Sequence, residues 1–234
     1  MKNQYFGDFG DYQKFSLLKA LRDSGGFNIM VHWMKTRDDG GNDGNRVAYL
    51  HDPETWGAFD NDIYRFLQKR IASGQKDLSV FEKSEHAAGL LFAGDNIEKF
   101  EDRLRTFGEV RKEKTADLIF FDPDNGIEVK STGTSNLRKY VLWNDIESIY
   151  DSGKSVLVYQ HFPRKDRETV IRERLQEFDD RALRRVFAVR VKHSVYFLLA
   201  QKKHEKNIVA ALDRYGTAWK HLVKIYQHAA DSSA

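Results

Sequence analysis

The sequence predicts an α/β protein built on a mostly parallel sheet that has helices on both faces and ends in an antiparallel hairpin. Two observations predict this architecture. Short apolar runs of strand-forming residues alternate with amphipathic helical segments, which is typical of parallel sheets covered by helices. The last two apolar runs are separated only by a tight turn at His193-Ser194, so no crossover helix fits between them and they must pair antiparallel.

The periodicity of apolar residues places the individual elements. Helical spacing predicts helices over 11–23, 63–73, 96–110, 144–153 and 164–179, and a final helix that carries Ile208, Leu212 and Tyr215. Apolar runs predict strands over 27–33, 117–121, 155–162, 184–191 and 195–201. We expect 118–121 and 156–160 to be adjacent parallel strands, and the hairpin to run from Arg185 to Gln201.

Length and composition limit the class of protein. The chain has 234 residues, 41% of them hydrophobic, which suits a single α/β domain over 1–234 in which residues 1–25 form a helical segment packed on the sheet. There are no cysteines, so disulfides, thiolate metal sites and a cysteine nucleophile are excluded. The net charge of +3 is too weak by itself to indicate a nucleic-acid partner. No signal peptide and no apolar run near the roughly 18 residues of a membrane helix is present, so a soluble cytoplasmic protein is expected.

Polar segments follow three of the predicted strands, at 38–45, 122–128 and 160–164. Open parallel sheets bind ligands beyond the carboxyl ends of their strands. We therefore expect Asp122, Asp124, His161 and Arg164 to line one pocket as the catalytic candidates. His193, at the hairpin turn, is expected to be structural only.

The stretch Asp122-Pro123-Asp124-Asn125-Gly126 suits a turn at every position. A buried strand that carries an acidic group to the edge of a sheet also suits a functional loop, so both interpretations stay open. The spacing excludes an EF-hand, because the glycine falls early and no acidic residue closes the loop. In a metal site, Asp122, Asp124 and Glu128 would hold Mg²⁺. Arg164 suits a phosphate or carboxylate, and a histidine such as His161 acts as base, ligand or donor.

A glycine-rich loop follows the first predicted strand. Its candidate cofactor-binding residues are Gly40, Gly41, Asp43 and Gly44. The loop does not match G-x-G-x-x-G, and a flexible surface loop is the preferred interpretation. Asp43 and His51 are metal candidates only if this loop folds inward.

The N-terminal segment repeats a Gly-Asp-aromatic unit before the first helix. Asp11 is expected to be the helix N-cap. The segment also holds Lys14 and four aromatic residues, Tyr5, Phe6, Phe9 and Tyr12. Aromatic residues beside a lysine can stack bases and meet phosphates, but here we favour packing at the edge of the core.

Five segments, "GDFGDYQKFSLLKAL", "NDGNRVAYL", "FFDPDNGIE", "KYVLWNDI" and "LVYQHFPR", resemble the motifs of a family of uncharacterised bacterial and phage-associated proteins. That resemblance spans most of the chain and implies no chemistry. "FFDPDNG" and "GDYQKFSLL" also distantly resemble ribosomal-RNA and DNA adenine methyltransferases. Those proteins have a strand that ends in Asp-Pro-Pro and an aromatic residue, and an Asp and a Lys before a Leu-rich helix.

The second resemblance implies a Rossmann-like methyltransferase fold, an S-adenosylmethionine cofactor and a nucleic-acid substrate. It implies that Asp122 accepts a hydrogen bond from the target amino group, and that Asp11, Lys14 and Asn125 lie at the substrate. The sequence departs from the pattern at Asp124, which replaces the second proline, and at Asn125, which replaces the base-stacking aromatic residue.

Three classes of function follow from these observations. The first is S-adenosylmethionine-dependent methyl transfer to nucleic acid, with the loop after the first strand holding the methionine moiety. The second is Mg²⁺-dependent phosphodiester hydrolysis, and the third is a non-catalytic binding module that keeps the fold. The architecture favours the first class, whereas an Asp-x-Asp pair favours the second.

Overall fold

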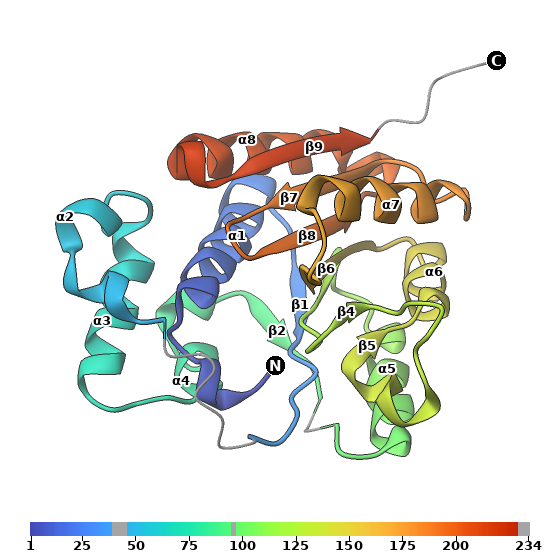
Figure 1. Cartoon of the computed structure of the whole chain (residues 1–234), viewed down its shortest axis with the longest axis horizontal. Coiled ribbons are helices and arrows are strands. Elements are labelled where there is room, and N and C mark those ends of the chain that lie inside the picture. Colours follow the sequence, from blue (N-terminus) through green and yellow to red (C-terminus); the bar gives the residue numbers. More distant parts are fainter. Residues whose placement is uncertain (39–45, 95–96, 229–234) are drawn as a thin grey trace.

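The computed structural model describes residues 1–38, 46–94 and 97–228. Its centre is a seven-stranded sheet in the order β2-β1-β3-β6-β8-β7-β9 (Figure 1). The strands are β1 (Ile29–His32), β2 (Leu90–Phe92), β3 (Leu118–Phe121), β6 (Ser155–His161), β7 (Val186–Arg190), β8 (Ser194–Leu199) and β9 (Lys224–His228). Strands β1, β2, β3, β6 and β7 run in one direction and β8 and β9 in the other. The sheet is therefore mostly parallel and Rossmann-like, which confirms the predicted fold class.

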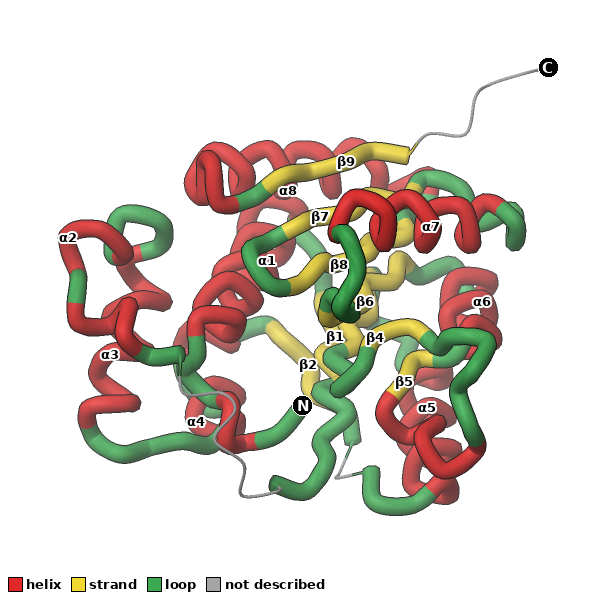
Figure 2. The backbone as a smooth tube through the Cα atoms, in the orientation of Figure 1, coloured by secondary structure: helices red, strands yellow, loops and turns green. Residues whose placement is uncertain are grey.

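Helices cover both faces of this sheet (Figure 2). On one face lie α1 (Phe9–Gly25), α3 (Asn61–Ala72), α4 (Leu78–Glu82) and α8 (Glu205–Trp219), and on the other α5 (Phe100–Lys112), α6 (Trp143–Asp151) and α7 (Arg167–Asp179). The short helix α2 (Pro53–Trp56) and a two-stranded sheet of β4 (Gly126–Ile127) and β5 (Tyr140–Val141) complete the larger elements. Single 3-10 turns occur at Asn3–Tyr5, Ala48–His51, Glu85–Ala87, Thr134–Lys139, Lys202–His204 and Lys220–Leu222.

Strand β3 is apolar at every position because both of its faces are covered. In β3, Leu118 and Phe120 pack in the core on the α1 side, whereas Ile119 and Phe121 pack on the α5 side. All four side chains are fully buried. The absence of polar alternation in this run is thus a direct consequence of helices on both faces.

The predicted pairings of the sheet are confirmed. Strands β3 and β6 are adjacent and parallel, with Leu118 opposite Ser155, and β7 and β8 form the antiparallel hairpin. The short strand β2 and the edge strand β9 were not predicted. Strand β2 has only three residues, and β9 has no fully buried residue, so neither shows the longer apolar run that marks the buried strands.

Helix α1 begins one turn earlier than the sequence predicts. Its N-cap is Asp8, whose side chain accepts a hydrogen bond from the backbone N–H of Asp11, so the prediction that Asp11 is the cap is wrong. Gly26 ends the helix in the left-handed conformation at φ 66°. The aromatic residues of this segment pack in the core as favoured, since Phe6, Phe9 and Tyr12 are buried. Capping by Asp8 leaves the Asp11 carboxylate available for other contacts.

No helix of the described residues is both long and apolar enough to cross a lipid bilayer.

Candidate functional site

A cavity of about 990 Å³ opens at the carboxyl edge of the sheet, beside the first turns of α1. All four predicted catalytic candidates line it: Asp122 and Asp124 after β3, and His161 and Arg164 at the end of β6. The three predicted substrate-binding residues Asp11, Lys14 and Asn125 line it as well. The expected convergence of strand ends is therefore confirmed for these residues, whereas their chemical roles remain predictions.

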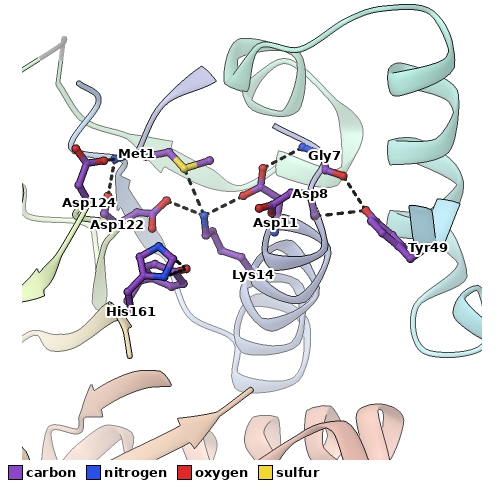
Figure 3. A network of polar contacts seen from close by, with 10 residues as sticks. Met1, Gly7, Asp8, Asp11, Lys14, Tyr49, Asp122, Asp124 and His161 are labelled. Atoms are coloured by element: carbon purple, nitrogen blue, oxygen red, sulfur yellow. Dashed lines mark hydrogen bonds and ion pairs between the residues drawn. The ribbon is translucent and has the colours of Figure 1, made fainter. Parts of the chain in front are cut away.

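The floor of the cavity is a buried ionic network that joins α1 to the end of β3 (Figure 3). The Lys14 ammonium lies 2.7 Å from Asp122 Oδ2 and 2.9 Å from Asp11 Oδ1. All three residues are at most 3% exposed. Burial alone would lower the pKa of Lys14, but the two carboxylates outweigh it and raise that pKa. One ammonium cannot neutralise two carboxylates. Burial therefore raises the pKa of Asp11, although the charge of Lys14 opposes the change.

Asp8 adds a third carboxyl group to this floor. It lines the same cavity and caps α1, but it forms no ion pair among the described residues. Burial and the neighbouring Asp11 raise the pKa of Asp8 to about 7. The sequence pattern Gly7-Asp8, repeated at Gly10-Asp11, was the signal that could have identified this residue.

Asp124 is more than a turn former. Its Oδ1 lies 2.8 Å from the nitrogen of Met1, and its Oδ2 accepts a 2.8 Å hydrogen bond from Thr36 Oγ1. Burial by itself would raise the pKa of Asp124, but the nitrogen of Met1 and the Thr36 hydroxyl together lower it. The nitrogen of Met1 also donates to the carbonyl oxygens of Met34, at 3.3 Å, and Asp122, at 3.2 Å. Three acceptors therefore surround one nitrogen in the crevice between β1 and β3.

The rest of the Asp-Pro-Asp-Asn-Gly motif turns the chain from β3 into β4. The Asn125 N–H donates to the Lys139 carbonyl at 3.0 Å, and Gly126 begins β4 opposite Tyr140. Gly126 adopts φ +103°, and a Cβ there would lie 2.8 Å from Cδ of Gln160. Only glycine combines this dihedral with this close approach.

Replacing Gly126 by alanine is expected to lower the free energy of unfolding by about 1–3 kcal/mol, because alanine is strained at this φ and collides with Gln160. Gly133→Ala is the matched control, since a Cβ at Gly133 meets no atom within 4 Å. Urea unfolding of both variants measures the difference. Equal stabilities would show that the turn tolerates a side chain.

Glu128 does not join Asp122 and Asp124. It is absent from the cavity lining, and its Oε1 accepts a 2.6 Å hydrogen bond from the Trp143 N–H. Within residues 1–38, 46–94 and 97–228, no three Asp, Glu or His side chains gather in a group that could hold a metal ion. The predicted Mg²⁺ set of three carboxylates is therefore not assembled, because β4 directs the Glu128 side chain toward α6.

The predicted cofactor-binding residues of the glycine-rich loop are not tested by the structure. Gly40, Gly41, Asp43 and Gly44 lie outside the described residues. His51 is exposed at the end of its 3-10 turn and does not line the cavity. The conditional metal site of His51 and Asp43 stays a prediction, because Asp43 lies outside the described residues.

His161 and His193 stand on the wall of the cavity. The Tyr159 hydroxyl lies 3.2 Å from His161 Nε2. The His161 side chain faces the cavity, and partial burial by the surrounding protein lowers its pKa. The charge of Asp122 opposes this change, whereas the charge of Lys14 lowers the pKa further. His193 also lines the cavity, so the prediction that it is structural only is not supported. Strand β8 pairs antiparallel with β6, with Ser194 opposite His161, and this register brings the hairpin turn to the same edge.

The cavity is also lined by cations that were not identified as site residues from the sequence. They are Lys2, Arg46, Lys139, Lys165 and Arg167. Lys139 comes from the turn before β5 and Arg167 from the first residue of α7, so only the tertiary fold places them together.

The fold and this cavity define the protein as a Rossmann-like α/β protein with a deep polar site at the carboxyl edge of its sheet. In comparisons with known proteins, no family model matches the chain, and no curated protein matches it at a significant level.

Proposed function

We propose that the protein transfers a methyl group from S-adenosylmethionine to an amino group of a nucleic-acid base. The observation that carries this proposal is the position of Asp122. Asp122 directly follows β3, and its carboxylate lies at the cavity floor. Its Oδ2 accepts a hydrogen bond from Lys14 at 2.7 Å. Oδ1 has no hydrogen-bond partner among the described residues, so it is available to accept from an amine that enters the cavity.

Methyl transfer to an amine depends on positioning more than on acid or base strength. S-adenosylmethionine supplies a methyl group on a positively charged sulfur. Asp122 would accept a hydrogen bond from the substrate amine and thereby aim its lone pair. Lys14, which is bonded to Asp122 and Asp11 at once, would fix the rotamer of the Asp122 carboxylate. Exact placement of this kind is what a buried ion pair can provide.

The chemistry of the crevice between β1 and β3 supports a donor with an α-ammonium group. The chain passes outward from β1 to β2 and returns to β3 on the other side of β1, and ligands of open α/β sheets bind at such a reversal. The carbonyl oxygens of Met34 and Asp122 and the Asp124 carboxylate converge there on the nitrogen of Met1. An amino-acid ammonium needs the same acceptors, so the donor would displace Met1 from them.

Nucleic acid is proposed as the substrate because of the charge of the cavity. Seven Lys and Arg side chains but only four Asp side chains line it. This excess suits a substrate that carries phosphate.

The proposal is tested by thermal shift and calorimetry with S-adenosylmethionine. A ligand of the native state should raise the Tm of the wild type by mass action. Asp124→Asn should weaken binding by about 10-fold, because it removes the charge that faces the ammonium. Asp62→Asn, at an exposed carboxylate paired with Lys19, is the control and should bind as the wild type does.

Two results would contradict the proposal. One is the absence of any response of the wild type to S-adenosylmethionine. The other is a stabilisation by Mg²⁺ that Asp124→Asn abolishes, which would favour phosphodiester hydrolysis instead.

A further inference from the structure

Charge is distributed unevenly along the cavity. At the floor, His161 faces the acidic groups Asp122 and Asp124 as well as Lys14. At the entrance, His193 lines the cavity together with Arg46 and Arg167, and after burial the charges of Arg46, Lys192 and Arg167 lower its pKa. The cavity is thus acidic at its floor and is lined by cations around His193.

Four cations at the entrance have no ion-pair partner among the described residues. Arg46, Lys139, Arg164 and Arg167 line the cavity, and none of them forms an ion pair with the described part of the chain. Lys165, in the same segment, differs because it pairs with Glu173 at 2.5 Å. Cations that repel one another without a compensating acid favour the binding of an anion.

We propose that Arg46, Arg164, Arg167 and His193, here called the cationic mouth, form a phosphate-binding subsite that holds the substrate's phosphate while its amine points to Asp122. Arginine suits this task because its planar guanidinium binds phosphate through two parallel hydrogen bonds. Three elements supply the subsite: the segment before the 3-10 turn at Ala48–His51, the β6–α7 connection with the start of α7, and the β7–β8 turn. The orientation of the amine rests on the proposed function, whereas the phosphate subsite does not.

The subsite defines the class of substrate. A phosphate ester of an amino-bearing base presents an anion at one end and an amine at the other, which matches the cationic mouth and the acidic floor. A nucleoside without phosphate uses only the floor and should bind much more weakly than its nucleotide.

The first test is the binding of a fluorescein-labelled single-stranded oligonucleotide to the full chain, without a methyl donor, over a range of salt concentrations. The double variant R164Q/R167Q should bind about 10-fold or more weakly, and its slope of log K against log salt should be less negative by about 1 to 2. Arg172→Gln is the matched control on α7, because Arg172 does not line the cavity. A double variant with the wild-type affinity and slope would overturn the subsite.

The second test uses inorganic phosphate and NMR of the histidine side chains. Burial and then the cations around His193 lower its pKa, so a bound phosphate that offsets these cations should raise that pKa. His204 is the internal control, since it lies at Lys202–His204 outside the cavity and contacts Ser155. A His193 titration that phosphate leaves unchanged would contradict the subsite.

These tests separate the subsite from the proposed function. Asp122→Asn should keep the wild-type slope of log K against log salt in oligonucleotide binding, because Asp122 lies at the floor and faces the amine rather than the phosphate. Oligonucleotide binding without any methyl transfer would leave the subsite in place and refute the proposed reaction. A nucleoside that binds as tightly as its nucleotide would refute the subsite.

Discussion

Lys14→Met is expected to lower the free energy of unfolding by about 3–5 kcal/mol, the usual cost of removing one partner from a buried ion pair. The variant would leave the carboxylates of Asp11 and Asp122 buried without their cation. Methionine keeps the length and apolar stem of lysine, so the loss of charge rather than of volume dominates. Urea unfolding at neutral pH measures the change.

Lys19→Met on the same helix is the matched control. Lys19 also contacts two carboxylates, Asp60 at 2.9 Å and Asp62 at 2.8 Å, but its side chain is 26% exposed. Exposed pairs of this kind contribute at most about 1 kcal/mol. Similar losses in the two variants would show that the cavity floor holds no special ionic network.

The Lys14→Met defect should shrink as the pH falls. Burial raises the pKa of Asp11 in the folded state above its unfolded value, and without Lys14 that pKa should rise further. A carboxyl group with a raised pKa in the folded state binds protons more tightly in the folded protein than in the unfolded chain. Its contribution to the free energy of unfolding is therefore present at low pH and is lost as the pH rises through the folded-state pKa. A defect of the same size at pH 5 and pH 8 would contradict this origin.

Asp122→Asn is expected to reduce the rate of methyl transfer by about 100-fold, the loss typical of misplaced reacting groups. Asparagine keeps the shape of the side chain but no longer presents a charged acceptor to the amine. Lys14 still pairs with Asp11, so the fold should be retained. A Tm measurement together with kcat and KM distinguishes the two effects.

Asp124→Asn provides the contrast for that experiment. Asp124 contacts the nitrogen of Met1 and Thr36 rather than Lys14, so the substitution should raise KM for the donor and leave kcat nearly unchanged. Equal losses of kcat in the two variants would show that Asp122 has no particular role at the acceptor amine.

The sequence predicted the fold well where strands are buried on both faces. The run 118–121 is apolar throughout because helices cover it on both sides, and that pattern is visible without coordinates. Strand β9 was not predicted because it lies at the sheet edge and none of its residues is fully buried. Its place depends on pairing with β7, which local sequence does not encode.

The sequence predicted only some of the residues of the candidate site. Asp122, Asp124, His161 and Arg164 follow predicted strands, so the rule that ligands bind at strand ends placed them together. The ion pair between Lys14 and Asp122 joins residues that are 108 positions apart, and no local pattern indicates it. His193 lines the cavity because the register of β6 and β8 sets Ser194 opposite His161, and local sequence does not indicate that register.

The most direct test of methyl transfer to a base amine uses S-adenosylmethionine that is labelled in its methyl group. Purified protein is incubated with the labelled donor and total nucleic acid, which is then digested to nucleosides and analysed by mass spectrometry. We expect label on an exocyclic amino nitrogen with the wild type and almost none with Asp122→Asn. Absence of any labelled nucleoside, or label that Asp122→Asn incorporates equally well, would contradict the proposed function.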